Sequence, residues 1–349
     1  MKNETGVQFN LDSTWDVFKA FLKRGKGRFF SFLYNRFAWE YYPKLRIIPS
    51  FPLNVDIEVC SICNLKCTHC FRQYMKIDDD PFMDMELYKK IIDECAREKL
   101  FTLKFSMRGE PLMHPEINEM IDYAKNKGIK EVWINTNGKT LNETMIRRFI
   151  QSGLDWLTVS VDGVGENYEK VRIPLKFEDT YEKLKLLRRL RDEARANKPV
   201  LKVQTIYSAI QDNPEEYLRT FQPIVDKISF NTDMNFKAIK VVPDPDFVCP
   251  RMWQRLAVTA SGDILRCPSD FLKEDVLGNV KNQSIKSIWH GPAMTRLRKM
   301  NLEGRRLEDI VCAKCHHGCK KVKTVLKHQE LERDMNAYVF EKKPVSSAK

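Results

Sequence analysis

Three closely spaced cysteines, Cys63, Cys67 and Cys70, are the residues of this chain most able to do chemistry. Three residues separate the first two and two residues separate the last two. In a reducing compartment such a group indicates a metal site or catalysis rather than disulfides. Cysteine is the usual ligand of a [4Fe–4S] cluster, and three ligands for four irons leave one iron open to another molecule.

A zinc site with Cys60 as the fourth ligand is the alternative for this group. Structural zinc sites separate their cysteine pairs by about a dozen residues or more, and here the pairs are much closer. We therefore favour iron–sulfur over zinc. Cys60 is interpreted as a small residue that ends the preceding strand.

A second group of cysteines lies late in the chain. His316 and His317 lie among them, so zinc stays open for this region. Only Cys95 stands outside both groups, in a helical pattern, and we predict that it belongs to the core. The members of the late group are Cys249, Cys267, Cys312, Cys315 and Cys319.

The elements that must position these residues alternate regularly. Short β-branched runs predict strands at residues 53–59, 102–106, 131–135, 156–161, 201–207 and 227–230. Amphipathic stretches between them predict helices at residues 84–98, 115–127, 141–152, 179–196 and 213–225. This alternation predicts α/β units and a parallel sheet, and six units fit a partial (β/α)6 barrel of the TIM type. Chemistry in such sheets lies at the carboxyl ends of the strands.

Composition shifts divide the chain into four parts. Residues 1–50 form a basic, aromatic arm, and residues 51–242 form the barrel. A small cysteine-rich auxiliary domain is expected at residues 243–322, and residues 323–349 are expected to be a C-terminal helix and tail. Within this last region the pattern over residues 320–337 predicts a basic helix, followed by a frayed end.

The stretch at residues 58–70, with its Cys63-Asn64-Leu65, resembles the cluster loop of the radical S-adenosylmethionine (radical SAM) superfamily. The resemblance implies that the open iron binds the amino and carboxylate groups of SAM. An injected electron then cleaves SAM to methionine and a 5′-deoxyadenosyl radical, which abstracts hydrogen from a substrate. It also implies an external one-electron reductant of the flavodoxin or ferredoxin type.

Further motifs at successive strand ends resemble the same family. Residues 107–111 are similar to its Gly-Gly-Glu motif, although Arg108 replaces the first glycine. Residues 136–138 and 160–163, with Arg172 following, resemble its ribose and carboxylate contacts. The resemblance implies that Glu110, Ser160 and Arg172 contact SAM.

The late cysteines resemble the SPASM and "twitch" extensions that hold auxiliary clusters in some members of this superfamily. Residues 257–266 predict a β-hairpin that brings Cys249 and Cys267 together. A full SPASM extension carries about seven cysteines for two clusters. We expect one auxiliary [4Fe–4S] cluster on Cys249, Cys267, Cys312 and Cys315, with Cys319 either replacing one of them or taking no part.

Charge and length exclude several classes of protein. The 349 residues carry a formal charge of +12, but the excess is concentrated in residues 17–46, which argues against a nucleic-acid enzyme. Residues 13–42 combine aromatic and basic side chains, and one interpretation is a segment that binds an anionic membrane surface. We favour the other interpretation, a helix packed across the open edge of the barrel. With no long apolar run and no signal peptide visible, we expect a cytoplasmic protein.

These observations predict a radical SAM oxidoreductase that acts on a small molecule. The resemblance favours a carbohydrate-like substrate, because the cysteine count is closer to the small-polyol dehydrogenases of the superfamily than to its peptide-modifying members. Maturation of a peptide or protein is the first alternative. A non-catalytic iron–sulfur protein that transfers electrons is the second, and Arg108 is its main support.

Overall fold

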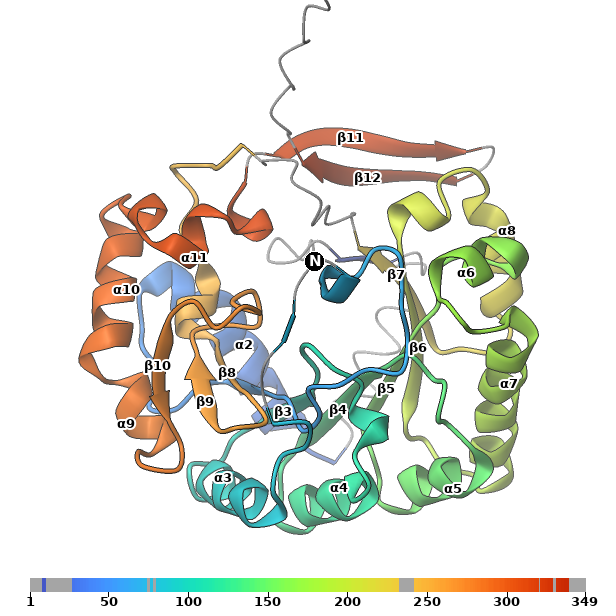
Figure 1. Cartoon of the computed structure of the whole chain (residues 1–349), viewed down its shortest axis with the longest axis horizontal. Helices are drawn as coiled ribbons and strands as arrows, with labels where there is room; N and C mark the ends of the chain where they lie inside the picture. The colour runs from blue at the N-terminus through green and yellow to red at the C-terminus, as the bar shows by residue number, and fades with distance from the viewer. Residues whose placement is uncertain are drawn as a thin grey trace, which may run out of the picture.

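The structure of the protein is a computed structural model that describes residues 8–10, 27–73, 76–77, 80–231, 242–319, 321–328 and 331–338. It places six parallel strands in one curved sheet, with neighbours in sequence pairing as neighbours in space (Figure 1). The predicted partial (β/α)6 barrel is confirmed. Its strands are β2 (Asn54–Ile57), β3 (Thr102–Phe105), β4 (Glu131–Thr136), β5 (Trp156–Ser160), β6 (Val200–Ile206) and β7 (Lys227–Asn231).

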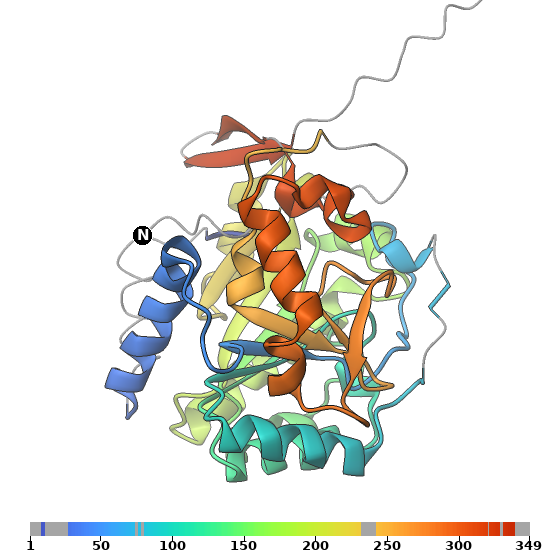
Figure 2. The same cartoon turned by 90° about the vertical axis from the view of Figure 1, so that its left-hand side faces the viewer.

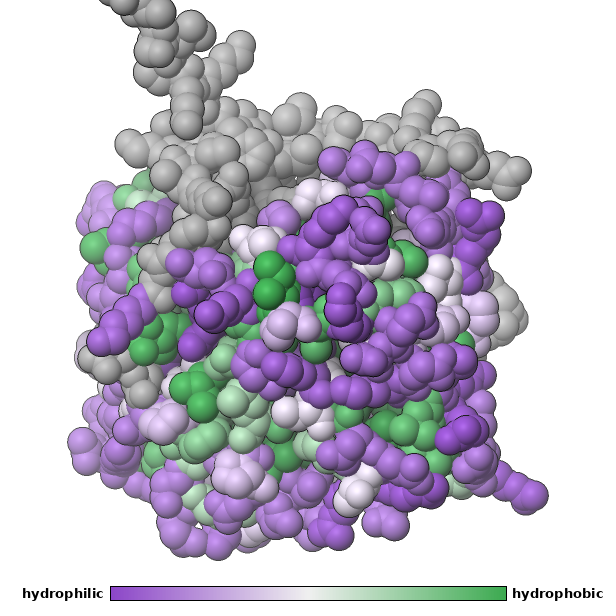
Figure 3. All heavy atoms as spheres, turned by 45° about the vertical axis from the view of Figure 1, so that its right-hand side comes forward, coloured by the Kyte–Doolittle hydropathy of each residue, from purple (hydrophilic) through white to green (hydrophobic). Residues whose placement is uncertain are grey.

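Helices surround these strands as an outer ring (Figure 1), and hydrophilic side chains cover much of the face where α5 to α8 come forward (Figure 3). Short α6 was not predicted from the sequence. The helices are α3 (Met85–Arg97), α4 (Ile117–Asn126), α5 (Glu143–Gln151), α6 (Gly165–Val171), α7 (Phe177–Glu193) and α8 (Pro214–Phe221). Short 3₁₀ turns join them at η1 (Phe71–Gln73), η2 (Pro111–Met113) and η3 (Tyr207–Ala209).

The strands alternate between an apolar face toward the helices and a polar face toward the barrel interior. Val55 and Leu103 belong to the hydrophobic core, whereas their neighbours Asp56 and Lys104 lie side by side in the sheet register. Asp56 accepts a hydrogen bond from Arg255 at 3.1 Å. Burial lowers the pKa of Lys104 to about 8, although Asp56 opposes the shift. The interior is therefore polar and charged rather than filled by aliphatic layers.

The sheet continues from the barrel into the C-terminal half of the chain. Strand β8 (Arg255–Val258) pairs parallel with β2, and β9 (Asp263–Leu265) and β10 (Val276–Asn279) follow antiparallel. The predicted hairpin is thus present, and its strands extend the barrel sheet.

Helices and turns complete this C-terminal part, and a carboxylate from the barrel fixes one of them. Glu94 of α3 accepts hydrogen bonds from the first backbone amides of α9, those of Ile285 at 3.0 Å and Lys286 at 2.9 Å. The elements are α9 (Ile285–Trp289), α10 (Pro292–Leu302), α11 (Ile310–Ala313), η4 (Pro250–Trp253), η5 (Arg306–Glu308) and η6 (His316–Gly318).

The N-terminal arm packs on the barrel differently from our expectation. Helix α2 (Phe29–Leu45) lies against the end where the strands begin, not across the open edge (Figure 2). Its residue Phe32 contacts Phe101, and the carbonyl of Trp39 accepts a hydrogen bond from Gln254 at 2.8 Å. Strand β1 (Gln8–Asn10) pairs antiparallel with β7 at the edge instead. The rest of the predicted segment, residues 13–26, lies outside the described residues.

The predicted C-terminal helix over residues 320–337 is wrong. Strands β11 (Lys321–His328) and β12 (Leu331–Tyr338) form an antiparallel pair there. The basic residues alternate with the β-branched Val322 and Thr324, and this period of two favours a strand over a helix. The expected frayed end at residues 339–349 lies outside the described part of the chain.

Asp155 connects Arg28, the residue before α2, to the end of the barrel where the strands begin. Its carboxylate accepts a hydrogen bond from the backbone amide of Val132 and pairs with Lys125, Lys198 and Arg28. Burial alone would raise the pKa of Asp155, but these three cations lower it below its usual range.

We expect Asp155→Asn to lower the free energy of unfolding at neutral pH by about 2–3 kcal/mol, because the cations lose their counter-charge. Since the folded pKa is depressed, this stabilisation is present above the unfolded pKa of about 4 and is lost as the pH falls below it. Urea unfolding at several pH values checks this. The control is Glu166→Gln, which removes an exposed ion pair with Lys170. If Asp155→Asn still differs from the wild type in its free energy of unfolding at low pH, the assignment is contradicted.

Candidate active site

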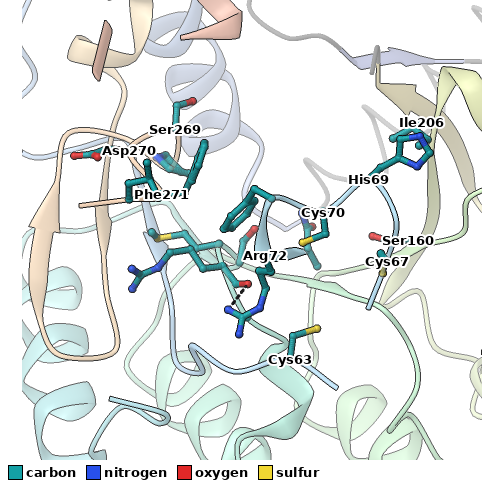
Figure 4. A pocket seen from close by; sticks show the side chains of 18 of the residues that line it. Cys63, Cys67, His69, Cys70, Arg72, Ser160, Ile206, Ser269, Asp270 and Phe271 are labelled. Atoms are coloured by element: carbon teal, nitrogen blue, oxygen red, sulfur yellow. Dashed lines mark hydrogen bonds between the residues drawn. The ribbon is translucent and has the colours of Figure 1, made fainter. Parts of the chain in front are cut away.

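One cavity of about 850 Å³ opens at the carboxyl ends of the barrel strands, where the sequence predicts chemistry. Cys63, Cys67 and Cys70 line one side of it, and their sulfur atoms face a common space (Figure 4). Residues 268–272 and 313–315 of the C-terminal part line the other side. Of the five late cysteines, Cys315 therefore borders the same cavity as Cys63, Cys67 and Cys70.

The loop after β2 carries Cys63, Cys67 and Cys70 as half-buried free thiols. Hydrogen bonds from the backbone amides of Lys66 and Thr68 to carbonyls at the C-terminal end of α6 and just beyond it hold the middle of this loop, at 2.9 and 3.1 Å. Burial raises the pKa of the Cys67 thiol to about 11, and Arg172 partly opposes the shift. Metal binding deprotonates such thiols.

Gly109 allows the second motif to lie directly against this loop. A Cβ atom at that position would come within 2.2 Å of the Cys60 carbonyl oxygen and 2.6 Å of the Ile62 carbonyl oxygen. The amide of Glu110 donates to the same Ile62 carbonyl at 2.8 Å. Only glycine fits this approach, so the second glycine of the motif has a steric reason.

Arg108, which replaces the first glycine, turns away from the cavity centre and pairs with a buried carboxylate. Its Nε and Nη2 atoms donate to Glu58 at 2.6 and 2.5 Å, a bidentate pair between the ends of β3 and β2. Glu58 also accepts from the amide of Ala260 at 3.3 Å. Arg108 therefore joins three parts of the sheet and leaves the approach of Gly109 intact.

Glu110 lies at the cavity wall, but neighbouring groups already engage its carboxylate. It accepts hydrogen bonds from Thr136 Oγ1 at 2.6 Å and from the amides of Asn137 and Leu112 at 2.7 and 3.0 Å. Burial raises its pKa in spite of these bonds. The carboxylate thus fixes the end of β4 against the second motif.

Arg172 and Ser160 line the same cavity. The Nε atom of Arg172 donates to Asp162 at 2.6 Å, and its Nη1 atom lies 3.7 Å from the sulfur of Cys67. Asp162 in turn accepts the amide of Ile206 at 3.0 Å. The structure thus brings all three predicted SAM contacts, Glu110, Ser160 and Arg172, to the wall that holds the cysteines.

Asn137 is a site residue that the sequence-based list omitted. Its Nδ2 atom lies 3.7 Å from the sulfur of Cys63 and donates to Asn64 Oδ1 at 2.9 Å. The available signal was its position directly after a strand, inside the motif at residues 136–138. An amide donor to a cluster sulfur is one of the ways in which proteins tune such clusters.

The late cysteines gather on the other side of the cavity. Burial raises the pKa of Cys249 to about 12, and the neighbouring Cys267 and Cys315 raise it further. Cys312 also has Cys249 and Cys267 as electrostatic neighbours. Cys319 is buried and forms a backbone bridge with Pro243. The four predicted auxiliary ligands therefore lie near one another.

The described residues hold no preformed site for a single metal ion. Among them, no three His, Cys, Asp or Glu side chains converge on one metal-ion position. A zinc ion requires four ligands at about 2.0–2.3 Å from one point, whereas the four irons of a cubic cluster each take a separate ligand.

Sequence profiles of known families match the two halves of this site. The radical SAM superfamily profile matches residues 57–221, and that of the SPASM iron–sulfur cluster-binding domain matches residues 249–316. The chain belongs to the radical SAM superfamily and carries a SPASM domain. Its cofactors are SAM, a [4Fe–4S] cluster and auxiliary iron–sulfur clusters, as these domains imply.

The curated relatives differ in how much of them this chain covers. The tungsten-containing aldehyde ferredoxin oxidoreductase cofactor-modifying protein of Pyrococcus furiosus is 31% identical over 43% of this chain, which is only 42% of that protein. The SAM-dependent 2-deoxy-scyllo-inosamine dehydrogenase of Niallia circulans is 25% identical over 75% of this chain and 92% of that protein.

Solved structures share the fold at lower sequence identity. The crystal structure of BtrN in complex with AdoMet and 2-DOIA has a TM-score of 0.53 and 23% identity, and the match covers 77% of this chain and 94% of that one. The radical SAM barrel with its C-terminal extension is therefore shared across these proteins.

We expect Gly109→Ala to destabilise the protein by about 3 kcal/mol or more and to lower iron loading of the first site, because the added methyl group collides with the backbone that leads to Cys63. Thermal unfolding and iron per chain after reconstitution measure both effects. Gly128→Ala is the comparison: nothing lies within 4 Å of its added Cβ, so we expect only the cost of its left-handed φ of +86°, about 1 kcal/mol, and no loss of iron. Equal losses in the two variants would contradict the steric argument.

Proposed function

We propose that this enzyme reductively cleaves SAM and uses the 5′-deoxyadenosyl radical to abstract a hydrogen atom from a small, carbohydrate-like substrate. The observation that carries the proposal is the cavity that Cys63, Cys67 and Cys70 line on one side and Cys315 of the SPASM domain lines on the other. A substrate in that cavity would lie between the site of hydrogen abstraction and a site that can accept an electron.

The residues of the first wall divide the work of holding the cluster and SAM. Cys63, Cys67 and Cys70 would hold the catalytic [4Fe–4S] cluster, which supplies the electron for SAM cleavage. Arg172, kept in place by Asp162, can bind the SAM carboxylate, and Ser160 can bond a ribose hydroxyl. Glu110 Oε1 accepts two hydrogen bonds and Oε2 accepts one, so we infer that Oε2 keeps an acceptor position for the SAM amino group while the carboxylate positions the strand ends.

Oxidation is the expected outcome because a second redox site borders the cavity. Loss of a hydrogen atom leaves a substrate radical, and loss of one further electron and a proton gives a two-electron oxidation. Cys249, Cys267, Cys312 and Cys315 would hold the auxiliary [4Fe–4S] cluster that takes this electron. An external one-electron reductant of the flavodoxin or ferredoxin type would supply the electron for SAM cleavage.

The cavity wall and one relative support a polar small molecule as substrate. Ser269, Asp270 and His317 offer hydrogen-bonding groups at the SPASM side, next to the stacked rings of Phe71 and Phe271. The match to the 2-deoxy-scyllo-inosamine dehydrogenase covers 92% of that protein and 75% of this chain. Turnover of a precursor peptide, and of no sugar or aminocyclitol, would favour peptide maturation instead.

The non-catalytic alternative loses its main support in the structure. It depended on Arg108 disturbing the second motif, but Arg108 pairs with Glu58 and leaves Gly109 against the cluster loop.

The decisive experiment is anaerobic reconstitution with iron and sulfide, followed by reduction and addition of SAM. We expect the wild type to form 5′-deoxyadenosine at about eight irons per chain. The triple variant Cys63→Ala, Cys67→Ala, Cys70→Ala should form none and keep about four irons. Iron loading without SAM cleavage, with candidate substrates present, would refute the proposed activity.

A complementary variant tests the auxiliary ligands. Replacing Cys249, Cys267, Cys312 and Cys315 by Ala should remove about four irons per chain. The variant should still cleave SAM in the absence of substrate. Cys95→Ala, a buried core cysteine, is the control. Iron loss in Cys319→Ala equal to that in Cys315→Ala would assign the fourth ligand position to Cys319.

A further inference from the structure

Helix α2 is apolar on both of its faces. Phe32, Asn35 and Ala38 are buried against the barrel. On the opposite side, Phe30 is 85% exposed and Phe37 is 50% exposed. A helix that is hydrophobic all round is normally buried all round, so the outer face of α2 lacks the polar surface that a solvent-facing helix carries.

Large exposed apolar side chains gather on the outer side of α2 and directly after its end, and together they are here called the aromatic face. More than half of the exposed large hydrophobic side chains among the described residues belong to it. Along the helix they recur at intervals of three and four residues, which places them on one side. The members of the aromatic face are Phe29, Phe30, Leu33, Tyr34, Phe37, Tyr41, Leu45, Ile47 and Ile48.

The charge of this segment distinguishes between the possible occupants of the face. Residues 17–46 contain one acidic residue, Glu40, among many lysines and arginines. On the helix itself Lys44 lies over the ring of Tyr41 and pairs with this Glu40 at 2.5 Å. Arg46 follows at the C-terminal end. A second copy of the chain would bring like charges together across a two-fold contact, which is unfavourable. An anionic lipid surface is complementary to both the charge and the apolar side chains.

We propose that the aromatic face docks α2 onto the surface of an anionic lipid bilayer, with the helix lying in the interface. Phenylalanine and leucine would enter the acyl boundary, while tyrosine hydroxyls and lysine stay at the headgroups. None of the described helices is long and apolar enough to cross a bilayer, so this is a contact with one surface.

The position of α2 makes such docking compatible with catalysis. The helix packs at the end where the barrel strands begin, and the loop carrying Cys63 lies on the opposite side of the molecule (Figure 2). Docking would therefore leave the mouth of the cavity away from the lipid. The proposal does not depend on which substrate the enzyme takes.

Flotation of the full-length protein with vesicles tests the proposal. We expect binding to mixed phosphatidylcholine–phosphatidylglycerol vesicles, weaker binding in high salt, and little binding to phosphatidylcholine alone. Phe30→Ser with Phe37→Ser should weaken binding at least about tenfold, because two large apolar side chains no longer enter the lipid. SAM cleavage by this double variant should match that of the wild type.

A matched control and a second measurement keep the test decisive. Val276→Ser with Leu302→Ser removes exposed apolar side chains elsewhere on the molecule and should leave vesicle binding unchanged. Light scattering after size-exclusion chromatography reports the oligomeric state. A wild-type dimer that the double variant converts to a monomer, with no vesicle binding, would overturn the proposal in favour of a second copy. A monomer that binds no vesicles would also overturn it.

Discussion

The active site depends on one close approach, in which the backbone at Gly109 lies against the backbone of residues 60–62. No side chain fits between these two segments, so the loop that carries Cys63, Cys67 and Cys70 has a fixed distance to the end of β3. The bidentate pair of Arg108 with Glu58, both buried, joins the ends of β3 and β2 next to this approach. The residues that we propose as SAM contacts line the cavity beside this approach.

The second constraint is that β8 pairs directly with β2. Because the barrel sheet itself continues into the SPASM domain, both cysteine groups are attached to one sheet. Glu94, which caps α9 from α3, adds a second attachment between the two parts. Substrate oxidation at two redox sites requires such a fixed relative placement.

The sequence predicted this barrel well because its signals are local. Apart from short α6, the barrel strands and helices were visible as periods of two or 3.6, and the cysteine spacing indicated the cluster loop. The parallel pairing of β8 with β2 joins residues some two hundred positions apart, and no local pattern announces it. No local pattern announces the pair of Arg108 with Glu58 either. In the sequence Arg108 only replaces a glycine of the Gly-Gly-Glu motif, whereas in the structure it forms a buried ion pair. At residues 320–337 basic charge was given more weight than β-branched alternation, and the helix prediction was wrong there.

Strand β1 has a consequence for the solubility of the protein. A six-stranded partial barrel leaves the outer hydrogen-bonding groups of β7 free to recruit a strand from another molecule. Residues Gln8–Asn10 pair with β7 and occupy those groups. The first residues of the chain thus act as protection against edge-to-edge aggregation, although they are far in sequence from every residue of the active site. A shortened chain that begins at the barrel would keep its catalytic residues and lose this protection.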